Sequence, residues 1–451
     1  MNADTIVAPA TPYGIGGIAV VRLCGPQSLI IVSKLLNNNG LCVVLKPRQA
    51  TLAYLHDQKG MVVDESIVTF FRSPNSYTGE DLIEIACHGS PIVVDKILST
   101  CSYYGARIAE PGEFTKRAFI NGKMDLIQAE AVASLIHSQS EESSRLNLRL
   151  LRGELSTKLN ELHKQIISAL SLVEFELDIS EEEIQDDLKE RVLNLIAEQI
   201  VQIHKLLDSH KQARMLNRGV LVVIAGPPNV GKSTLLNTLS ETNRAITSNI
   251  PGTTRDAIDV SLILGGVPIN LVDTAGIRHT TEEIEQEGVN RTFNYLKKAD
   301  LIILVHDPAL VEIPYNHHPK NIPVIEIVNK VDLLTKTELT AVMDAYPKRM
   351  FLSAKSGYNI DILKQNIKDS LGIGGSLSDN ITITTNRQQI SLKKCFNRLS
   401  TATELLNRPR IPYELISIEL RDALDAVGVI LGKTTPDDIL NNIFNKFCVG
   451  K

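Results

Sequence analysis

The sequence of 451 residues lacks long apolar runs, and none of its apolar segments approaches the roughly 18 residues that a membrane-spanning helix requires. Its first residues, 1–6, lack the basic segment and apolar core of a secretory signal peptide. The six cysteines show no Cys-x-x-Cys pair and no metal-ligand spacing. Together these absences predict a soluble protein of the reducing cytoplasm.

An excess of positive charge is also missing, because 52 Asp and Glu residues outnumber 47 Lys and Arg residues and give a formal net charge of −5. This balance disfavours a protein that coats nucleic acid non-specifically, although it permits contact with one RNA through a local basic patch. With 43% hydrophobic and 22% charged residues, the composition is that of an ordinary globular protein, and the length predicts roughly two to four domains.

The order of sequence patterns predicts an α/β plus α fold, in which a Ras-like nucleotide-binding domain is inserted into a helical domain. Residues 1–118 mix β-rich runs with helical spacing, as expected of an α+β domain. Residues 119–218 almost lack proline and repeat apolar residues at three and four positions, which predicts long helices. Residues 219–373 alternate strands and helices like a doubly wound parallel sheet, and residues 374–451 are helical again. Predicted strands include residues 18–23, 51–55, 66–71, 82–86, 221–225, 269–272, 301–305, 324–328 and 350–352, and predicted helices include 91–103 and 232–239.

Two motifs predict a polyphosphate site. In Gly226-Pro-Pro-Asn-Val-Gly-Lys-Ser233 the glycines let backbone amides approach phosphate, the Lys232 ammonium reaches the outer phosphates, and the Ser233 hydroxyl suits Mg²⁺. Asp273-Thr-Ala-Gly276 would bring a carboxylate and a backbone amide to Mg²⁺ and the terminal phosphate.

Two further motifs follow in the order and spacing of a guanine-nucleotide-binding module, and they predict the base. In Asn329-Lys-Val-Asp332 the carboxylate can accept both guanine N–H groups that adenine lacks, and the asparagine can donate to the purine. Ser353-Ala-Lys355 would direct a backbone amide to guanine O6. The complete set of predicted GTP contacts is Asn229, Val230, Gly231, Lys232, Ser233, Thr234, Ser248, Asn249, Ile250, Pro251, Gly252, Thr253, Thr254, Asp273, Thr274, Ala275, Gly276, Asn329, Lys330, Asp332, Ser353, Ala354 and Lys355.

Ile277 stands after Asp-x-x-Gly, where signalling GTPases commonly carry the glutamine that orients the attacking water. Isoleucine cannot do this, so either hydrolysis is very slow or another element supplies the missing stabilisation. Asn229 and the oxygen-rich segment 248–256 would suit a large monovalent cation that neutralises phosphate charge. Asn229 is also interpretable as a residue that stabilises the turn, and both interpretations stay open.

Thr254 is the natural second protein ligand of Mg²⁺ when the segment 248–256 closes. Several glutamates that follow Gly276 are candidates for acid–base work, and each is also interpretable as an acid that the helix dipole favours at a helix start. Their spacing does not distinguish among them: Glu282, Glu283, Glu285 and Glu287.

Several segments of the chain are not generic GTPase motifs. They are Asp4-Thr-Ile-Val-Ala8, Ala10-Thr-Pro12, Ser76-Tyr-Thr-Gly-Glu-Asp81, Pro111-Gly-Glu-Phe-Thr-Lys-Arg-Ala-Phe119, Gln128-Ala-Glu-Ala131, Gly252-Thr-Thr-Arg-Asp256 and Cys448-Val-Gly-Lys451. Through these segments and its domain order, the chain resembles the MnmE family (also called TrmE) of tRNA modification GTPases over essentially its whole length.

The resemblance implies a homodimer joined through the N-terminal domains, which bind 5-formyl- or 5,10-methylene-tetrahydrofolate as a one-carbon donor. The matching folate-site positions are Arg22, Glu84 and Lys123, with Lys451 reaching in from the helical domain. Outside such a family, Arg22 and Lys123 would be interpreted as ordinary surface charges. A carboxylate inside an otherwise apolar strand, such as Glu84, needs a partner in any protein.

The resemblance further implies K⁺ held by Asn229, Ser248, Ile250 and Thr253, and Mg²⁺ held by Ser233 and Thr254. Threonine is expected where this chain has Ser248, and the serine keeps a hydroxyl. The family's catalytic glutamate falls on Glu285, positioning water through a second water, and Arg278 lies nearby.

The resemblance also implies a heterotetramer with an FAD-containing protein, MnmG (also called GidA), that adds an aminomethyl-type group at C5 of the wobble uridine of certain tRNAs. FAD would come through that partner alone, because nothing in this sequence encodes flavin binding. Cys448 is interpretable either as a nucleophile beside the folate or as a packing residue. The alternative function is a GTP-switched RNA or ribosome-assembly binding factor, although such factors usually carry a basic appendage that this sequence lacks.

Overall fold

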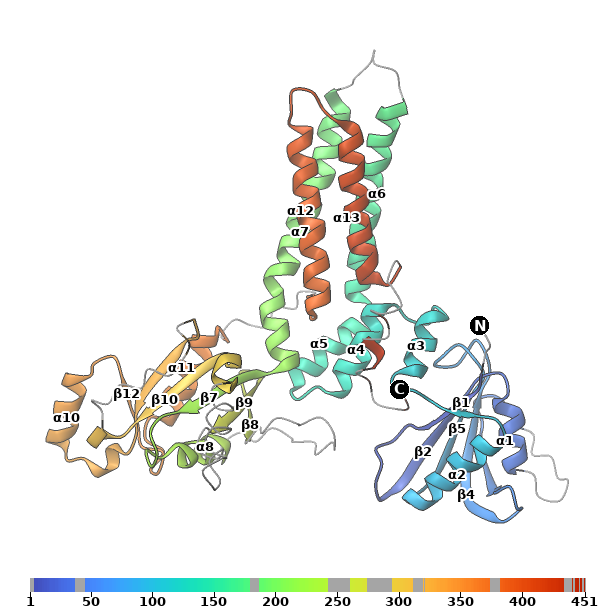
Figure 1. Ribbon diagram of the computed structural model, residues 1–451, viewed down its shortest axis with the longest axis horizontal. Helices are drawn as coiled ribbons and strands as arrows, with labels where there is room; N and C mark the ends of the chain where they lie inside the picture. The colour runs from blue at the N-terminus through green and yellow to red at the C-terminus, as the bar shows by residue number, and fades with distance from the viewer. Residues whose placement is uncertain are drawn as a thin grey trace. The chain divides into compact units, whose positions relative to one another are not determined.

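The computed structural model describes residues 4–36, 45–178, 186–241, 260–273, 294–310, 319, 321–373, 382–433, 440, 443–445, 447 and 450 (Figure 1). The chain divides into two compact units, each assembled from separate stretches. The first unit takes residues 1–133, 150–199 and 394–451, and the second takes 134–149 and 200–393. No helix within the described ranges is long and apolar enough to cross a membrane.

A six-stranded sheet forms the N-terminal part of the first unit, in the order β3-β4-β5-β2-β1-β6. Its strands are β1 (Ile6–Pro9), β2 (Gly16–Cys24), β3 (Ala50–His56), β4 (Val62–Phe71), β5 (Leu82–Gly89) and β6 (Arg107–Ile108). Neighbours pair antiparallel except β1 and β6, which run parallel. The four strands predicted in this region are confirmed. β1 and β6 escape the sequence pattern because they span only 4 and 2 residues.

Helices cover both faces of this sheet. On one face, α1 (Ser28–Leu36) and α2 (Pro91–Tyr103) bury an aliphatic core with the strands, and α2 has the predicted bounds. On the other face, α3 (Glu113–Ile120) inserts Phe114, which packs fully buried against Ile6 and Leu82. Burying a side chain of this size contributes about 1.5–3 kcal/mol, so Phe114 is a main anchor of α3.

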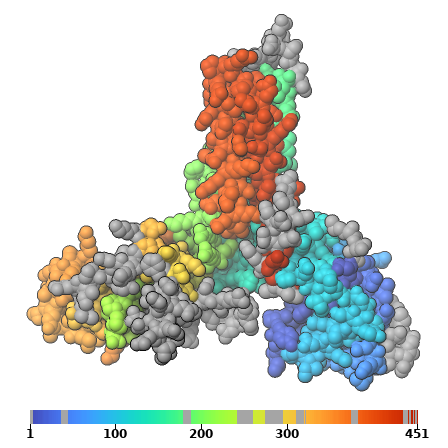
Figure 2. All heavy atoms as spheres, in the orientation of Figure 1, coloured from blue at the N-terminus to red at the C-terminus, as the bar shows by residue number. Residues whose placement is uncertain are grey.

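Long helices make up the rest of the first unit and continue into the second. They are α4 (Leu126–Ile136), α5 (Glu141–Leu151), α6 (Glu154–Asp178), α7 (Asp186–Arg218), α12 (Asn386–Leu406) and α13 (Tyr413–Leu431). Arg421 pairs with Glu174 at 2.6 Å and Lys433 donates to Asn160 at 3.1 Å, so α13 runs antiparallel along α6. Figure 2 shows the outward side chains of α12 and α13 as one continuous surface. The helical character predicted for these regions is confirmed.

The second unit is built on a sheet in the order β12-β11-β10-β7-β9-β8. Its strands are β7 (Val220–Ala225), β8 (Val260–Leu264), β9 (Val267–Asp273), β10 (Leu301–His306), β11 (Val324–Val328) and β12 (Met350–Phe351). All neighbours are parallel except β8 and β9, which form an antiparallel hairpin at the edge. The predicted parallel sheet is thus confirmed, and β8 is an addition that the sequence pattern did not indicate.

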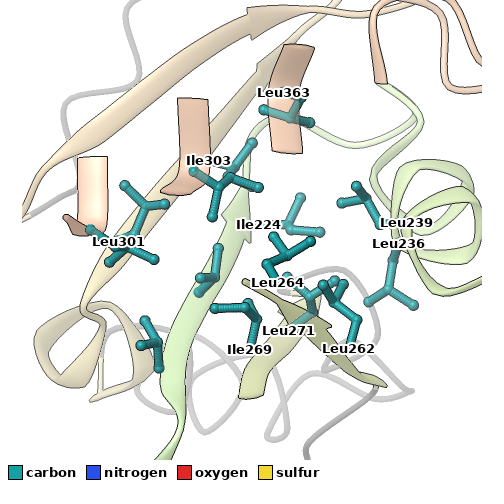
Figure 3. Packing of buried hydrophobic residues seen from close by; sticks show 14 of the residues in the cluster. Ile224, Leu236, Leu239, Leu262, Leu264, Ile269, Leu271, Leu301, Ile303 and Leu363 are labelled. Carbon is teal, nitrogen blue, oxygen red and sulfur yellow. The ribbon is translucent and has the colours of Figure 1, made fainter. Parts of the chain in front are cut away.

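Helices α8 (Lys232–Glu241), α10 (Lys336–Ala345) and α11 (Ile360–Leu371) pack around this sheet. Figure 3 shows the core in which Leu236 and Leu239 of α8 and Leu363 of α11 meet the strand residues Ile224 and Ile303. These buried contacts hold the strand ends and the first turn of α8 in place, and the predicted site lies at those ends.

Four cysteines lie in the described part of the chain, and all are reduced and buried. Burial raises the pKa of Cys24, Cys101 and Cys395 to about 12 and that of Cys87 to about 11. These thiols therefore stay protonated at neutral pH and behave as small apolar side chains.

Candidate functional site

The loop between β7 and α8 has the geometry of a phosphate cradle. Residues 226–231 link the buried strand to a helix that begins at Lys232, so the amides of the first turn face outward from the helix N-terminus. Gly231 has φ 91°, and a Cβ there would collide with Asn329 Nδ2. Only glycine fits this close approach, which accounts for its position in the motif.

Asn229 lies in the same loop with φ 64°, a left-handed conformation in which asparagine is several-fold enriched over other non-glycine residues. Its backbone carbonyl accepts a hydrogen bond from Lys330 Nζ at 2.5 Å. The interpretation of Asn229 as a residue that stabilises the turn therefore has direct geometric support. This backbone role leaves its side-chain oxygen available for an ion.

Lys232 and Ser233 sit where β7 and β9 end. Lys232 is 5% exposed and its Nζ donates to the carbonyls of Gly226 and Pro227 at 3.1 and 2.7 Å, so the ammonium is held over the loop. Ser233 Oγ donates to Oδ2 of Asp273 at 2.6 Å. A hydroxyl and a carboxylate oxygen at one point form the donor set that Mg²⁺ prefers, so these residues fit that ion.

Asn329 ties the phosphate loop to the base-side loops. Its Nδ2 donates to the Val230 carbonyl at 2.9 Å, and its Oδ1 accepts from the Ala354 amide at 2.9 Å. The side chain is 2% exposed, so both bonds form away from water. One amide hydrogen of Asn329 remains for a purine, and the rest of the side chain serves to fix three loops together.

The predicted base-reading carboxylate is exposed and held in one orientation. Ser353 Oγ donates to Oδ1 of Asp332 at 2.6 Å, and Ser353 itself is fully buried. Oδ2 of Asp332 and the second lone pair of Oδ1 can accept from a ligand. Lys355 is exposed beside them, while Thr234 lies exposed in the first turn of α8.

Asp307, which follows β10, was not among the predicted site residues. Its Oδ2 accepts from Lys330 Nζ at 2.8 Å, so Lys330 lies between Asp307 and the phosphate loop. Burial pushes the pKa of Asp307 up, but the bonds from Lys330 and from the Ala309 amide outweigh it and leave the pKa below its ordinary value. No motif marks this residue, because its role depends on β10 lying beside β7.

The described members of the predicted GTP site therefore meet at one edge of the sheet, which is called here the nucleotide edge. They follow the carboxyl ends of β7, β9, β11 and β12, the edge at which open α/β sheets bind their ligands. The remaining predicted residues lie outside the described ones: Ser248, Asn249, Ile250, Pro251, Gly252, Thr253, Thr254, Thr274, Ala275, Gly276, Arg278, Glu285, Cys448 and Lys451.

A second cluster surrounds Arg22 in the first unit. Arg22 on β2 and Glu84 on β5 are direct cross-strand partners, and Nε and Nη2 of the arginine donate to one carboxylate oxygen at 3.1 and 2.6 Å. The guanidinium also lies 5.4 Å from the ring centre of Tyr77 and 5.7 Å from that of Phe114. Glu84, unusual in an apolar strand, thus has the partner that its position requires.

The end of the chain reaches this cluster. Arg22 Nη1 donates to the Gly450 carbonyl at 3.4 Å, and Gly450 is buried with φ 95°. A Cβ on Gly450 would collide with the Pro9 carbonyl. The penultimate residue is therefore in contact with the same arginine that the sequence predicts for the folate site.

Lys123 lies apart from Arg22 and Glu84, the other two described residues of the predicted folate site. Its Nζ donates to the Pro74 carbonyl at 3.0 Å, and in the described residues no contact joins it to Arg22 or Glu84. Pro74 and Tyr77 belong to the same loop between β4 and β5, so Lys123 borders the cluster through that loop. Tyr77 and Phe114 were not predicted as site residues, although both fall within segments that carried the family resemblance.

The fold and the nucleotide edge define a guanine-nucleotide-binding P-loop protein with an added α+β domain. The family described as GTP-binding protein TrmE N-terminus matches residues 5–123, and the family described as MnmE helical domain matches residues 126–448. The chain belongs to the MnmE family of tRNA modification GTPases. This membership confirms the predicted family, fold class and enzyme class.

Full-length relatives agree with this assignment. The tRNA modification GTPase MnmE of Chlorobium chlorochromatii (strain CaD3) is 39% identical over 470 residues, covering 99% of this chain and 98% of that one. The tRNA modification GTPase MnmE of Aquifex aeolicus (strain VF5) is 39% identical over 452 residues, covering 99% and 100%. A crystal structure of an Aquifex aeolicus Era variant bound to GDP and AlF₄⁻ is 30% identical with a TM-score of 0.27, covering 40% of this chain and 66% of that one. The family assignment rests on the sequence matches.

Proposed function

We propose that this chain is a K⁺-dependent GTPase that, together with an FAD-containing partner, adds an aminomethyl-type group at C5 of the wobble uridine of certain tRNAs. The one-carbon unit would come from 5-formyl- or 5,10-methylene-tetrahydrofolate. The observation that carries the GTPase part is the convergence of Ser233 on Asp273, with Asn329 linking the phosphate loop to the Asp332 loop. Family membership supports the tRNA part.

In this proposal the nucleotide edge performs electrostatic work. Lys232 and the amides at the start of α8 would neutralise phosphate charge, and Ser233 with Thr254 would hold Mg²⁺, which would offset more of that charge. Asn229, Ser248, Ile250 and Thr253 would hold K⁺, which would supply the charge neutralisation that an arginine finger gives in other GTPases. Glu285 and Arg278 complete the catalytic set, with the glutamate acting on water through a second water.

The cluster around Arg22 is proposed to hold the folate. A guanidinium suits the folate glutamate tail, and Glu84 can accept from the donors of the pterin edge. Tyr77 offers a ring beside Arg22, the buried ring of Phe114 supports the guanidinium from within, and Lys123 and Lys451 add positive charge. Cys448 keeps two interpretations, as a nucleophile toward the one-carbon unit or as a packing residue of the pocket.

The proposed assembly is a cytoplasmic homodimer joined through the N-terminal domains, which associates with the flavoprotein MnmG (GidA) into a heterotetramer. The flavoprotein contributes the redox step with FAD, and this chain contributes GTP turnover and the folate. The domain bounds proposed are 1–118 for folate and dimerisation, 119–218 and 374–451 for the two helical parts, and 219–373 for the GTPase.

The first test is GTP turnover in matched KCl and NaCl, with Mg²⁺ present and protein concentration varied. We expect turnover to require K⁺ and to rise with protein concentration, because nucleotide domains that meet across a dimer would favour the active state. Equal turnover in both salts would remove the K⁺ site from the proposal.

Two variants test the remaining parts of the proposal. Glu285→Ala is expected to keep nucleotide affinity and lose turnover, and normal turnover would assign catalysis to a neighbouring glutamate. Removing residues 448–451 is expected to spare GTP turnover and abolish tRNA modification in a reconstitution with the flavoprotein. Modification that survives this deletion would exclude the tail from the folate site.

A further inference from the structure

A basic surface lies on the second unit where α7 meets α12. Lys211, Arg214 and Arg218 follow one another at spacings of three and four residues, so they project from one face of α7, and all three are exposed. Lys393 is exposed on α12. These four side chains are called here the α7–α12 basic surface.

Contacts between the two helices bring these charges together. The hydroxyl of Thr382, just before α12, donates to the Ser209 hydroxyl of α7 at 2.7 Å. His210 follows Ser209 and is 3% exposed. Its pKa is lowered first by burial and then by the positive charges of Arg214 and Lys393. The Thr382–Ser209 hydrogen bond thus holds the segment that leads into α12 against the part of α7 that carries Lys211 and Arg214.

Few acids border this patch. Residues 209–218 and 382–393 contain no Asp or Glu, and across the described ranges none of the four basic side chains forms an ion pair. The nearest acid along α7 is Asp208, three residues before Lys211, whose carboxylate lies 2.8 Å from His204 and is neutralised there only when that imidazole is protonated. On α5, Glu141 pairs with Arg145 at 2.5 Å.

The composition of the patch favours a polyanion over a protein partner. Protein interfaces draw much of their binding energy from buried aromatic anchors, and residues 209–218 and 382–393 contain no Phe, Tyr or Trp, although Ile390 is 67% exposed there. Exposed Lys and Arg spaced about 5–6 Å apart along a helix are instead suited to successive phosphates of a nucleic acid strand. In a chain of net charge −5, an RNA would be repelled from most of the surface and attracted here.

We infer that the α7–α12 basic surface binds the phosphate backbone of tRNA. This inference rests on the proposed function for the choice of tRNA over other RNA. Four phosphate contacts would supply affinity and orientation without reading sequence, so the choice of tRNA would be made elsewhere in the assembly.

The test measures binding of the full-length chain alone to an unmodified tRNA transcript with uridine at the wobble position, across a series of KCl concentrations. The variant carries Lys211→Gln, Arg214→Gln, Arg218→Gln and Lys393→Gln together. Because each phosphate contact contributes about 0.7–0.9 to the slope of log Kd against log salt, we expect the slope to fall by about 3. At about 100 mM KCl we expect Kd to rise at least tenfold.

A matched control changes the same net charge elsewhere. Lys59→Gln, Lys164→Gln, Lys336→Gln and Lys348→Gln remove four exposed lysines scattered over other elements, and this variant should bind tRNA within about twofold of wild type. A second variant keeps the charge of the surface through Lys211→Arg, Arg214→Lys, Arg218→Lys and Lys393→Arg, and it should retain binding. GTP turnover and melting temperature of all variants verify that they fold.

Three outcomes would overturn the inference: no tRNA binding by the wild-type chain, an unchanged salt slope in the glutamine variant, or loss of flavoprotein binding with tRNA binding intact. The proposed function is tested separately by modification of tRNA in the wild-type reconstitution with the flavoprotein. If the wild-type reconstitution modifies tRNA and the glutamine variant has an unchanged salt slope, the assignment of this surface is wrong and the proposed function stands.

Discussion

Arg22 and Glu84 stand directly opposite each other on β2 and β5, 62 positions apart in the sequence. Two nitrogens of the Arg22 guanidinium donate to the same carboxylate oxygen of Glu84. The pairing orients the guanidinium so that its third nitrogen points to the Gly450 carbonyl. A planar group is thus held by β5, by the end of the chain and by two aromatic rings. This arrangement depends on the fork of donors that arginine has and lysine lacks.

Arg22→Lys is therefore expected to weaken binding of 5-formyl-tetrahydrofolate at least tenfold, about 1.4 kcal/mol or more. The variant keeps the charge and loses the fork, while the nucleotide edge is untouched, so GTP turnover should not change. Isothermal titration measures the affinity. Arg410→Lys, an exposed arginine between α12 and α13, is the control and should bind normally. Normal folate affinity in Arg22→Lys would place the folate elsewhere.

Gly450→Ala should release the end of the chain from the Arg22 cluster. The added Cβ collides with the Pro9 carbonyl, and alanine is strained at φ 95°. Removal of the terminal lysine by carboxypeptidase B should become several-fold faster. Gly60→Ala separates the two effects, because Gly60 has φ 78° and no neighbour within 4 Å of its Cβ position. Equal digestion of Gly450→Ala and wild type would mean that the close approach does not hold the tail.

Asp332→Asn is expected to change the preferred base from guanine to xanthine. The carboxylate accepts from the guanine N–H groups, whereas the amide presents a donor that matches the xanthine carbonyl. Ser353 can still donate to Oδ1, so the side chain keeps its orientation. The ratio of GDP to XDP affinities should shift by about 100-fold or more toward XDP, as measured by competition binding. Asp344→Asn on α10 should leave the ratio unchanged, and a persistent guanine preference in Asp332→Asn would mean that another group reads the base.

Asn329→Ala should destabilise the second unit even without nucleotide. The variant leaves the Val230 carbonyl and the Ala354 amide without their buried partner, at a cost of about 2–3 kcal/mol. Urea unfolding followed by circular dichroism measures this, since the chain contains no Trp to serve as a fluorescent probe. Asn397→Ala on the exposed face of α12 should change stability by less than about 0.5 kcal/mol. Two variants of equal stability would show that the linkage contributes little to the fold.

His306 should make the second unit less stable in mild acid. It is 2% exposed at the end of β10, and burial, followed by the charge of Arg349, lowers its pKa below the ordinary value of 6.5, with Glu326 opposing. The folded state therefore favours the neutral ring, while the unfolded chain takes up a proton below about pH 6.5. The stabilisation that neutral His306 gives to the folded state is fully present above about pH 6.5. It is lost as the pH falls, by up to about 1.4 kcal/mol per pH unit.

Urea midpoints between pH 5 and 8 measure this dependence. His306→Asn should flatten the slope below pH 6.5, and His210→Asn should act in the same direction because burial lowers its pKa too. Asn397→Ala, which removes no ionisable group, is the control and should keep the wild-type slope. A slope that is the same in all variants would assign the acid sensitivity to other groups.

The sequence predicted those features whose residues are close together in the chain. Ser233 follows the loop after β7 and Asp273 is the last residue of β9, so their motifs located them before any fold was known. Asp307 and Tyr77 were missed because their roles arise from neighbours supplied by other strands and loops. Family resemblance placed Arg22 and Glu84 in one predicted site, but their direct pairing was not predicted, since cross-strand register is not encoded in either local segment.

The protonated state of the four buried thiols makes chemical labelling selective. Cys24, Cys87, Cys101 and Cys395 should be slow to react with maleimides in the native protein, because thiolate is the reactive form and each pKa is about 11 or 12. Any rapid modification must then fall on Cys42 or Cys448. In a Cys42→Ser variant, a single maleimide dye would therefore label Cys448 and report on the end of the chain. The four buried cysteines of the core need not be removed.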